Sequence, residues 1–364
     1  MEVKIVKQND KTDVKKLWAD AFSEQEPFLS WYFDNFWKSE NSLCAKNDEG
    51  CLLGALTLIP YDAKFSGKVY KTSYIAGVSV DKKFRNQGIA KTLMKSAILK
   101  QRERGETLSL LIPFNYDFYR KMGYEVCYER VEQKLNNTIK CEAFDVAFLD
   151  IENYSEMNSL YESFCEDKNG YIIRDKHSWE YILKRLAEQR TFAIGYRDCG
   201  KLLAYCVYTK ENEKTVIHEI VGDNYSKEKL ISYIFKTEKN VFSIMPDFKN
   251  EKSEKKPTVM ARITDSGAAF GKLKKSNVKI KITDDFIEEN NGVFSPGSEI
   301  KCKSDEYDAE MDIKYFTQYF CGFKTCFELF KEGHIKTSEE VFKKLDDLIQ
   351  RKDNYINLIM SEDF

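Results

Sequence analysis

Proline, histidine and long apolar runs are scarce in this chain. It has 6 prolines and 3 histidines among 364 residues. The histidines, His177, His218 and His334, lie too far apart for the ligand spacing of a zinc site, and we expect no metal. The longest apolar run, Cys51 to Ile59, is well short of the roughly 20 residues that a membrane-spanning helix needs. We therefore expect no membrane span.

A signal sequence, a disulfide framework and a charge excess are absent as well. The start, Met1 to Lys4, has no apolar signal core, and the ten cysteines include no C-x-x-C pair. We therefore expect reduced cysteines and a cytoplasmic location. Lys plus Arg number 57 against 59 for Asp plus Glu, so nothing in the charge balance indicates a nucleic-acid partner.

What the chain does have is the composition of a globular protein. Hydrophobic residues make up 42% and aromatic residues 14%. At roughly 150 residues per domain, the length predicts two to three domains. Strand formers and amphipathic spacing alternate in the first third. The expected helices cover 13–22, 27–38 and 88–104, and the expected strands cover 42–46, 51–60, 68–81 and 108–112.

In the rest of the chain, the pattern of expected helices and strands weakens near 136–155, which we interpret as a domain boundary. A second boundary falls at a charge run, Lys249–Lys256, which we interpret as a solvated connection between domains. Between them, the order of expected helices and strands repeats that of the first part. After the run come short strands, at 259–264, 278–283 and 299–303, mixed with helices. We predict domains at 1–142, 143–256 and 257–364.

The sharpest local feature is the loop from Asp81 to Gly88, which follows Val78-Ser79-Val80 and precedes a helix. Small residues at Gly88 and Ala90 leave backbone N–H groups accessible at the helix N-terminus, an arrangement that binds phosphate. The pattern is neither G-x-G-x-x-G nor a P-loop. Alternatively, Gly88 is only a turn residue and Arg85 only a surface charge.

Two further segments complete a resemblance. The run Arg85–Ala90, followed by Leu108–Pro113 and by Phe118-Tyr119-Arg120-Lys121-Met122-Gly123-Tyr124, resembles the acetyl-CoA site of GNAT N-acetyltransferases. The resemblance implies that the strand ending at Val80 splays from the next strand and exposes backbone groups to the pantetheine arm, while the loop amides bind the diphosphate. The expected acetyl-CoA residues are Val78, Ser79, Val80, Arg85, Asn86, Gln87, Gly88, Ile89, Ala90, Lys91, Phe114 and Asn115.

Tyr119 is the candidate general acid, because a hydroxyl beside the departing coenzyme A can protonate its thiolate. Ordinary pKa values of roughly 8.5 for a thiol and 10 for a phenol allow that transfer once the site adjusts them. The alternative for Tyr119 is an ordinary half-buried tyrosine. Backbone N–H at Val80 is the candidate donor to the oxyanion that develops on the thioester carbonyl.

The plan of the whole chain is similar to that of the Eis-type (enhanced intracellular survival) multidomain acetyltransferases. The likeness implies an α/β (α+β) fold, with two tandem GNAT-like domains followed by a sterol-carrier-protein-like domain. It also implies that the chain's own C-terminal carboxylate, here that of Phe364, serves as catalytic base. The alternative is a frayed and irrelevant terminus. A homo-oligomer, a hexamer in the family, is implied too.

The acetyl acceptor is expected beside the aromatic helix near residues 28–37. A primary amine must lose a proton before it attacks, and aromatic faces and carboxylates attract its cationic form. The candidate acceptor residues are Glu26, Phe28, Trp31, Trp37 and Asp363, although aromatic residues at this spacing are more often core.

The sequence therefore predicts transfer of acetyl from acetyl-CoA directly to a primary amine, of aminoglycoside, polyamine or lysine type, in a ternary complex. The second unit reads Val221-Gly222-Asp223-Asn224 at the corresponding loop, and Asp223 opposes anion binding there, so we expect no cofactor in it. The alternative function is a non-catalytic acetyl-CoA sensor or a carrier of apolar ligands.

Overall fold

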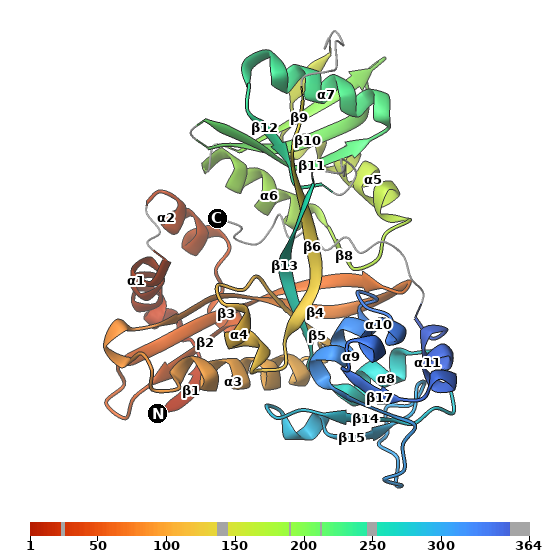
Figure 1. Ribbon diagram of the computed structural model, residues 1–364. Helices are drawn as coiled ribbons and strands as arrows, with labels where there is room; N and C mark the ends of the chain where they lie inside the picture. Colours follow the sequence, from red (N-terminus) through yellow and green to blue (C-terminus); the bar gives the residue numbers. More distant parts are fainter. Residues whose placement is uncertain (23–25, 137–144, 189–190, 212, 246–252, 350–364) are drawn as a thin grey trace. The chain divides into compact units, whose positions relative to one another are not determined.

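The computed structural model describes residues 1–22, 26–136, 145–188, 191–211, 213–245 and 253–349. Their contacts define two compact units. The first takes in Met1–Tyr128, Asn169–Ile173 and the described residues from Val259 onward; the second takes in Glu129–Lys168 and Arg174–Thr258. Strands β6 (Glu125–Lys134) and β13 (Glu254–Ile263) contribute residues to both units (Figure 1).

The main sheet of the first unit has the strand order β1-β2-β3-β4-β5-β13, and β8 pairs with β3. Strands β2, β3 and β4 form an antiparallel meander, and β5 then pairs with β4 in parallel. The strands are β1 (Glu2–Ile5), β2 (Ser42–Lys46), β3 (Leu52–Phe65), β4 (Lys68–Val80), β5 (Leu108–Leu111) and β8 (Tyr171–Ile173). The expected meander at 42–81 is confirmed.

Helices pack on both faces of this sheet because their apolar residues recur every three or four positions. The helices are α1 (Lys11–Phe22), α2 (Phe28–Asn35), α3 (Ile89–Glu103) and α4 (Tyr116–Arg120), with 3-10 turns η1 (Gln8–Asp10), η2 (Ser39–Asn41) and η3 (Lys82–Phe84). On α3, Ile89, Leu93 and Ala97 are buried against the strands. On α1, Trp18 packs directly over Gly77 of β4, where any Cβ would lie 2.2 Å from the indole ring. Figure 1 shows α1 and α3 on opposite sides of the meander.

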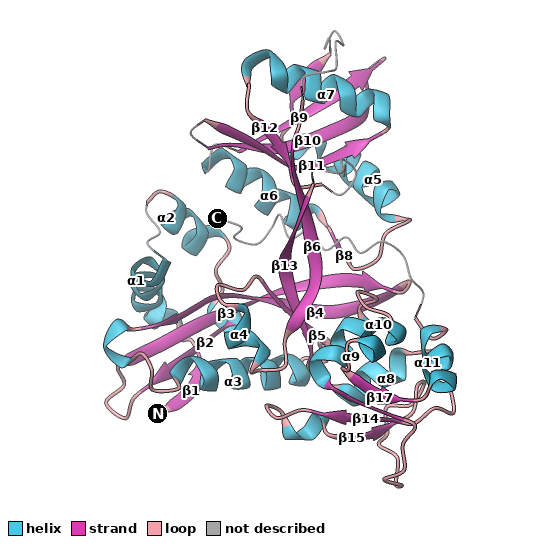
Figure 2. Ribbon diagram, in the orientation of Figure 1, coloured by secondary structure: helices cyan, strands magenta, loops and turns pink. Residues whose placement is uncertain are grey.

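The last part of the first unit is a second, smaller sheet with helices, in the order β15-β14-β16-β17 (Figure 2). Its elements are α8 (Ser266–Lys272), β14 (Ile280–Thr283), η6 (Glu288–Asn290), β15 (Gly292–Phe294), β16 (Ala309–Asp312), α9 (Ile313–Phe320), α10 (Cys326–Lys331), β17 (Ile335–Thr337) and α11 (Glu339–Asp346). Phe270 stacks between Phe294 and Phe316, with ring centroids 5.0 and 4.5 Å apart, and anchors α8 and α9 to the sheet.

The second unit repeats the strand and helix order of the first sheet. Strands β9, β10 and β11 form an antiparallel meander, and β12 pairs in parallel with β11 after helix α7. The elements are β7 (Val146–Phe148), η4 (Ile151–Asn153), α5 (Tyr154–Cys165), α6 (Lys176–Glu188), β9 (Thr191–Asp198), β10 (Lys201–Glu211), β11 (Lys214–Gly222), α7 (Asn224–Thr237) and β12 (Val241–Ser243). Its core holds a fully buried ion pair between Arg174 and Glu219, at 2.7 Å.

Two expectations for the later part of the chain differ from the structure, the first wholly and the second in part. Residues 299–303 form no strand: a hydrogen bond from Cys302 N–H to Val293 O, 2.8 Å long, ties this segment to β15, and Ile300 is exposed, so the segment has no apolar face to bury. The end of the charge run, from Glu254 to Pro257, is mostly exposed, as expected, but it forms the start of strand β13 and is not an irregular connection. Its Lys256 pairs with Glu132 of β6 at 3.0 Å, which accommodates the charge within a strand.

Among the described residues, no helix combines the length and apolarity needed to cross a membrane. Within the same residues, no group of three or more His, Cys, Asp or Glu side chains could hold a metal ion.

Candidate active site

Strands β4 and β5 diverge beside the predicted loop. Their parallel pairing covers only Thr72 to Tyr74 against Leu108 to Leu110. Strand β4 continues to Val80 and stays paired with β3 over that whole length, apart from an irregularity near Gly77. The second half of β4 therefore has β3 on one side and no pairing to β5 on the other.

The Val80 backbone faces this open side. Asp81 N–H donates to Leu53 O of β3 at 2.9 Å, and successive residues of a strand point their backbone groups in alternate directions. Val80 therefore directs its N–H and C=O away from β3. The side chain of Arg85 reaches the same place, since its Nε donates to Val80 O at 3.3 Å. A polar backbone edge next to a guanidinium can receive a polar, anionic ligand.

The loop between β4 and α3 turns sharply and leaves the start of α3 accessible. The Asp81 carboxylate accepts a hydrogen bond from Lys83 N–H at 2.8 Å and shapes the first turn. Asn86 and Gly88 then adopt positive φ values of 63° and 78°. Gly88 is the N-cap of α3, and no side chain caps the helix N-terminus there. The first N–H groups of α3 and the positive end of its dipole are thus available to an anion.

The other expected acetyl-CoA residues lie around this loop or on the strands that lead to it. Val78 is half-buried, whereas the Ser79 hydroxyl is buried and donates to Ala55 O at 3.3 Å. Gln87 and Lys91 are exposed, and Ile89 packs into the core below. Phe114 is 73% exposed, and Asn115 caps helix α4 by accepting from Phe118 N–H at 3.0 Å. Ala90 is half-buried in the first turn of α3.

Tyr119 is buried, at 3% exposure, within an aromatic cluster. Its ring makes edge contacts with Phe118 at 5.1 Å, Phe114 at 5.6 Å and Tyr124 at 6.0 Å. Burial, with a smaller effect of Tyr124, raises the pKa of Tyr119 above its ordinary value. The phenol therefore keeps its proton at neutral pH and can donate a hydrogen bond to an anionic sulfur. The hydroxyl of Tyr124 is occupied by Ser109, at 2.6 Å.

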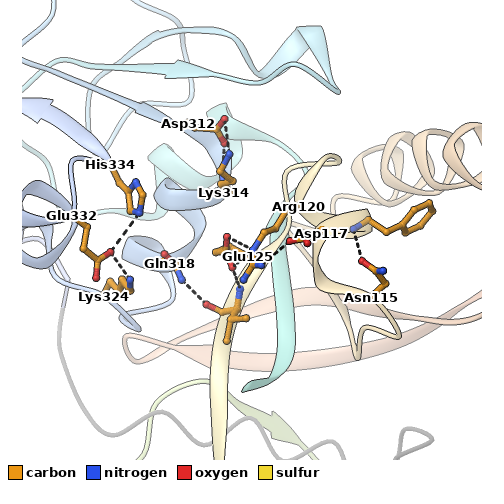
Figure 3. A network of polar contacts seen from close by, with 12 residues as sticks. Asn115, Asp117, Arg120, Glu125, Asp312, Lys314, Gln318, Lys324, Glu332 and His334 are labelled. Atoms are coloured by element: carbon orange, nitrogen blue, oxygen red, sulfur yellow. Dashed lines mark hydrogen bonds and ion pairs between the residues drawn. The ribbon is translucent and has the colours of Figure 1, made fainter. Parts of the chain in front are cut away.

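The turn after Tyr119 is fixed by charged side chains that sequence reasoning did not single out. Arg120 donates through Nε to both oxygens of Glu125, at 3.1 and 3.0 Å, and through Nη1 to Asp117 at 3.1 Å (Figure 3). The Glu125 carboxylate also accepts from Val126 N–H, and Gln318 of α9 donates to Val126 O at 2.8 Å. The sequence signal that could have predicted this ion pair is an Arg and a Glu five residues apart around a turn. These bonds hold α4 against β6.

The aromatic helix α2 forms a packed cluster. Phe28 and Trp37 are buried and Trp31 is half-buried. The Trp37 indole N–H is buried without a hydrogen-bond partner in the described part of the chain. Glu26 pairs with Lys15 at 3.0 Å and accepts from Ser30 N–H at 2.9 Å. These contacts, the Ser30 hydrogen bonds first, lower the pKa of Glu26 to about 2.

The structure brings most of the expected acetyl-CoA residues together with the β4–β5 opening. Of the aromatic candidates, Phe28 and Trp31 lie on α2 and Trp37 follows it, in the same unit. The remaining two candidates, Asp363 and Phe364, lie outside the described residues.

The matching loop of the second unit is closed to an anion by a side chain. Asp223 is the N-cap of α7, and its carboxylate accepts from Ser226 N–H at 3.0 Å and from the Ser226 hydroxyl at 2.6 Å. A carboxylate stands where Gly88 leaves the α3 N-terminus open. The two loops of one chain thus offer opposite charge to a phosphate.

Comparisons with known proteins agree with this geometry. Residues 2–127 match the acetyltransferase (GNAT) domain family, and residues 266–357 match the sterol carrier protein domain family. The chain therefore combines a GNAT acetyltransferase domain with a C-terminal sterol-carrier-type domain in a mixed α and β fold. Among curated proteins, no sequence matches the chain.

Solved structures share the fold over nearly the full length. A GCN5-related N-acetyltransferase from Anabaena variabilis is similar at 17% identity with a TM-score of 0.84, covering 98% of each chain. A probable N-acyltransferase from Enterococcus faecalis is similar at 18% identity with a TM-score of 0.83, again over 98% of each chain. Eis1 from Mycobacterium abscessus is similar at 13% identity with a TM-score of 0.76, over 98% of this chain and 99% of its own.

The class that these findings define is an acyltransferase whose donor is acetyl-CoA. The GNAT domain carries that assignment, since the structural likeness at such identities concerns the fold alone. The enzyme is thereby favoured over the non-catalytic sensor or carrier.

Proposed function

We propose that the enzyme transfers acetyl from acetyl-CoA directly to a primary amine in a ternary complex. The observation that carries the proposal is the divergence of β4 from β5 beside an uncapped α3 N-terminus, with Tyr119 in the same buried cluster as Ile89 of α3. The diphosphate binds the N–H groups from Asn86 to Lys91, and the pantetheine arm runs along Val78–Val80. The thioester carbonyl accepts a hydrogen bond from Val80 N–H, which strengthens as the oxygen gains charge.

Tyr119 assists the departure of coenzyme A. A phenol of raised pKa is a weaker acid than a thiol in water, so full proton transfer requires that the same burial also raises the pKa of the leaving thiolate. Both groups lose solvent in the same cluster, which favours a strong hydrogen bond followed by protonation. The Phe364 carboxylate accepts the proton of the attacking amine. Support for that role comes from the resemblance to Eis-type enzymes.

The acceptor is an amine of the aminoglycoside, polyamine or lysine class. The aromatic residues Phe28, Trp31 and Trp37, with Glu26 and Asp363, line its approach in this proposal. The Lys15 contact already neutralises Glu26, so Glu26 acts on a cationic acceptor only if that pair opens.

Several organisational features belong to the same proposal. The domain limits are 1–142, 143–256 and 257–364, the middle domain is a degenerate GNAT copy, and the last domain delivers Phe364 to the site. The enzyme is a cytoplasmic homo-oligomer. The repeated order of β9–β11, α7 and β12 supports the degenerate copy, and the carboxylate of Asp223 supports its lack of cofactor.

An acceptor screen tests the proposed function. The full-length enzyme is incubated with trideuteroacetyl-CoA and a panel of aminoglycosides, polyamines and lysine peptides, and products are detected by their mass shift. We expect transfer to at least one amine, lowered in Tyr119→Phe and in a variant with one glycine added after Phe364. Free coenzyme A released at the same rate with and without every amine would contradict direct transfer.

A further inference from the structure

Arg262 is a buried cation in the first unit that the reaction described above does not use. It lies on β13 opposite Ser109 of β5, and its side chain has no exposed area. One arm of its guanidinium donates to Met122 O, and the other donates to the carboxylate of Asp284. A charge in such a place needs hydrogen-bonded partners, because burying an unpaired charge is strongly destabilising. Arg262 thus joins the turn after Tyr119 to the segment that follows β14.

Gly123 explains why the turn admits this side chain. Gly123 has φ +77°, and a Cβ there would lie 1.9 Å from Arg262 Nη1. Any other residue would both strain the backbone and displace the guanidinium. The glycine of the Phe118–Tyr124 motif therefore serves the approach of Arg262 as well as the turn itself.

Asp284 holds the guanidinium in a fixed place. One carboxylate oxygen accepts from Phe286 N–H and Ile287 N–H, at 2.9 and 3.0 Å. The other accepts from Asn290 Nδ2 at 2.9 Å in addition to Arg262. Every oxygen is thus bound at least twice, so the carboxylate cannot rotate without losing hydrogen bonds.

Hydrogen bonds within the turn connect the residue that Arg262 contacts to the backbone of Tyr119. Met122 N–H donates to Tyr119 O at 2.9 Å, and Tyr124 N–H donates to the same oxygen at 3.3 Å. Tyr119, Met122, Phe286 and Ile287 also share one buried apolar cluster. A shift of Arg262 would therefore move the Met122 carbonyl and, through it, the backbone of Tyr119.

We propose that Arg262 and Asp284 are positioning residues for Tyr119, so that the sterol-carrier-type part of the first unit sets the placement of the proton donor. The inference rests on the proposed function of Tyr119. Arg262 acts on the chemical step through Tyr119 and not on acetyl-CoA binding, because its hydrogen bonds end on Met122 of the turn and on Asp284, and neither ends on the diphosphate loop.

The test is a mutant cycle with a matched control. Arg262→Met/Asp284→Asn removes the charge pair, and Arg174→Met/Glu219→Gln removes an equally buried pair in the second unit. We expect the first variant to lower kcat about 10-fold with the KM for acetyl-CoA changed less than about 2-fold. We expect the second to leave kcat near the wild-type value. In a Tyr119→Phe background, the Arg262→Met/Asp284→Asn change should lower kcat by less than about 2-fold further.

A smaller perturbation covers the case in which the double variant does not fold. Gly123→Ala displaces Arg262, whereas Gly105→Ala has a similar φ of +70° with nothing within 4 Å of its Cβ. Only Gly123→Ala should lower kcat, and only it should speed amide exchange in residues 116–124.

An unchanged kcat in the Arg262 and Gly123 variants, or an equal loss with and without Tyr119, overturns the inference while the proposed function stands. A Tyr119→Phe enzyme with wild-type kcat overturns the role of Tyr119 and this inference together.

Discussion

Placing a carboxylate at Gly88 should abolish most of the affinity for coenzyme A. The change Gly88→Asp places a carboxylate at the helix start that corresponds to Asp223 in the second unit, although the backbone is left-handed at Gly88 and extended at Asp223. Space is available, because a Cβ at Gly88 meets nothing within 4 Å, and Asp and Asn tolerate positive φ better than other residues. The variant therefore tests charge with little steric disturbance.

The expected loss follows from the repulsion between the new carboxylate and the diphosphate. At a separation of about 5 Å and an effective dielectric constant of about 20, one like-charge pair costs about 3 kcal/mol. That corresponds to about 100-fold in the dissociation constant. The loss should shrink as salt rises, since the screening length at 0.1 M is about 10 Å.

Calorimetric titration with coenzyme A measures this effect, and Gly88→Asn is the matched control. Asparagine has nearly the same shape and φ preference without the charge, so it should weaken binding by less than about 3-fold. Equal binding by the Asp and Asn variants would refute the assignment of the α3 N-terminus as the diphosphate site.

Three further predictions concern catalysis and stability. Tyr119→Phe should lower kcat by about 100-fold with acetyl-CoA affinity changed less than about 2-fold, as steady-state kinetics and calorimetry can show, and an unchanged kcat would remove Tyr119 from the mechanism. Gly77→Ala should lower the free energy of unfolding, measured in urea, by about 3 kcal/mol, because its Cβ would overlap Trp18. Gly50→Ala, also at positive φ but in open space, should lower it by about 1 kcal/mol. Equal losses in the two variants would contradict the packing of α1 on β4. The contacts of the Glu26 carboxylate lower its pKa from 4.5 to about 2 in the folded state. Its contribution to folding stability is therefore present above pH 4.5 and is lost as the pH falls from 4.5 towards 2. The thermal midpoint of Glu26→Gln should therefore lie below that of the wild type at pH 6, and the gap should narrow by pH 3; a constant gap would contradict the Ser30 and Lys15 contacts.

Local signals predicted the first sheet and the turn that precedes α3. Residues 88–104 have apolar residues at helical spacing, and α3 covers Ile89–Glu103. The small residues Gly88 and Ala90 at its start indicated an accessible N-terminus, and in the structure Gly88 is the N-cap with no side chain hydrogen-bonded to the helix start. Such features depend on neighbours in the sequence, and their physical cause is local.

Features that depend on distant partners were missed. The strand at residues 254–257 was missed because nothing nearby in the sequence shows that Lys256 meets Glu132, 124 residues away. In the same way, Arg262 reads as a lone charge in an apolar strand until the fold brings Met122 and Asp284 to it. Residues 299–303 alternate in polarity like a strand, yet no buried face exists to receive them.

A crystal structure of the enzyme with coenzyme A tests the central claim most directly. We expect the diphosphate oxygens within hydrogen-bond distance of backbone N–H groups between Asn86 and Lys91, the pantetheine beside Val78–Val80, and the sulfur next to the Tyr119 hydroxyl. A diphosphate bound elsewhere in the molecule, or a sulfur on the far side of β4 from Tyr119, would contradict the account.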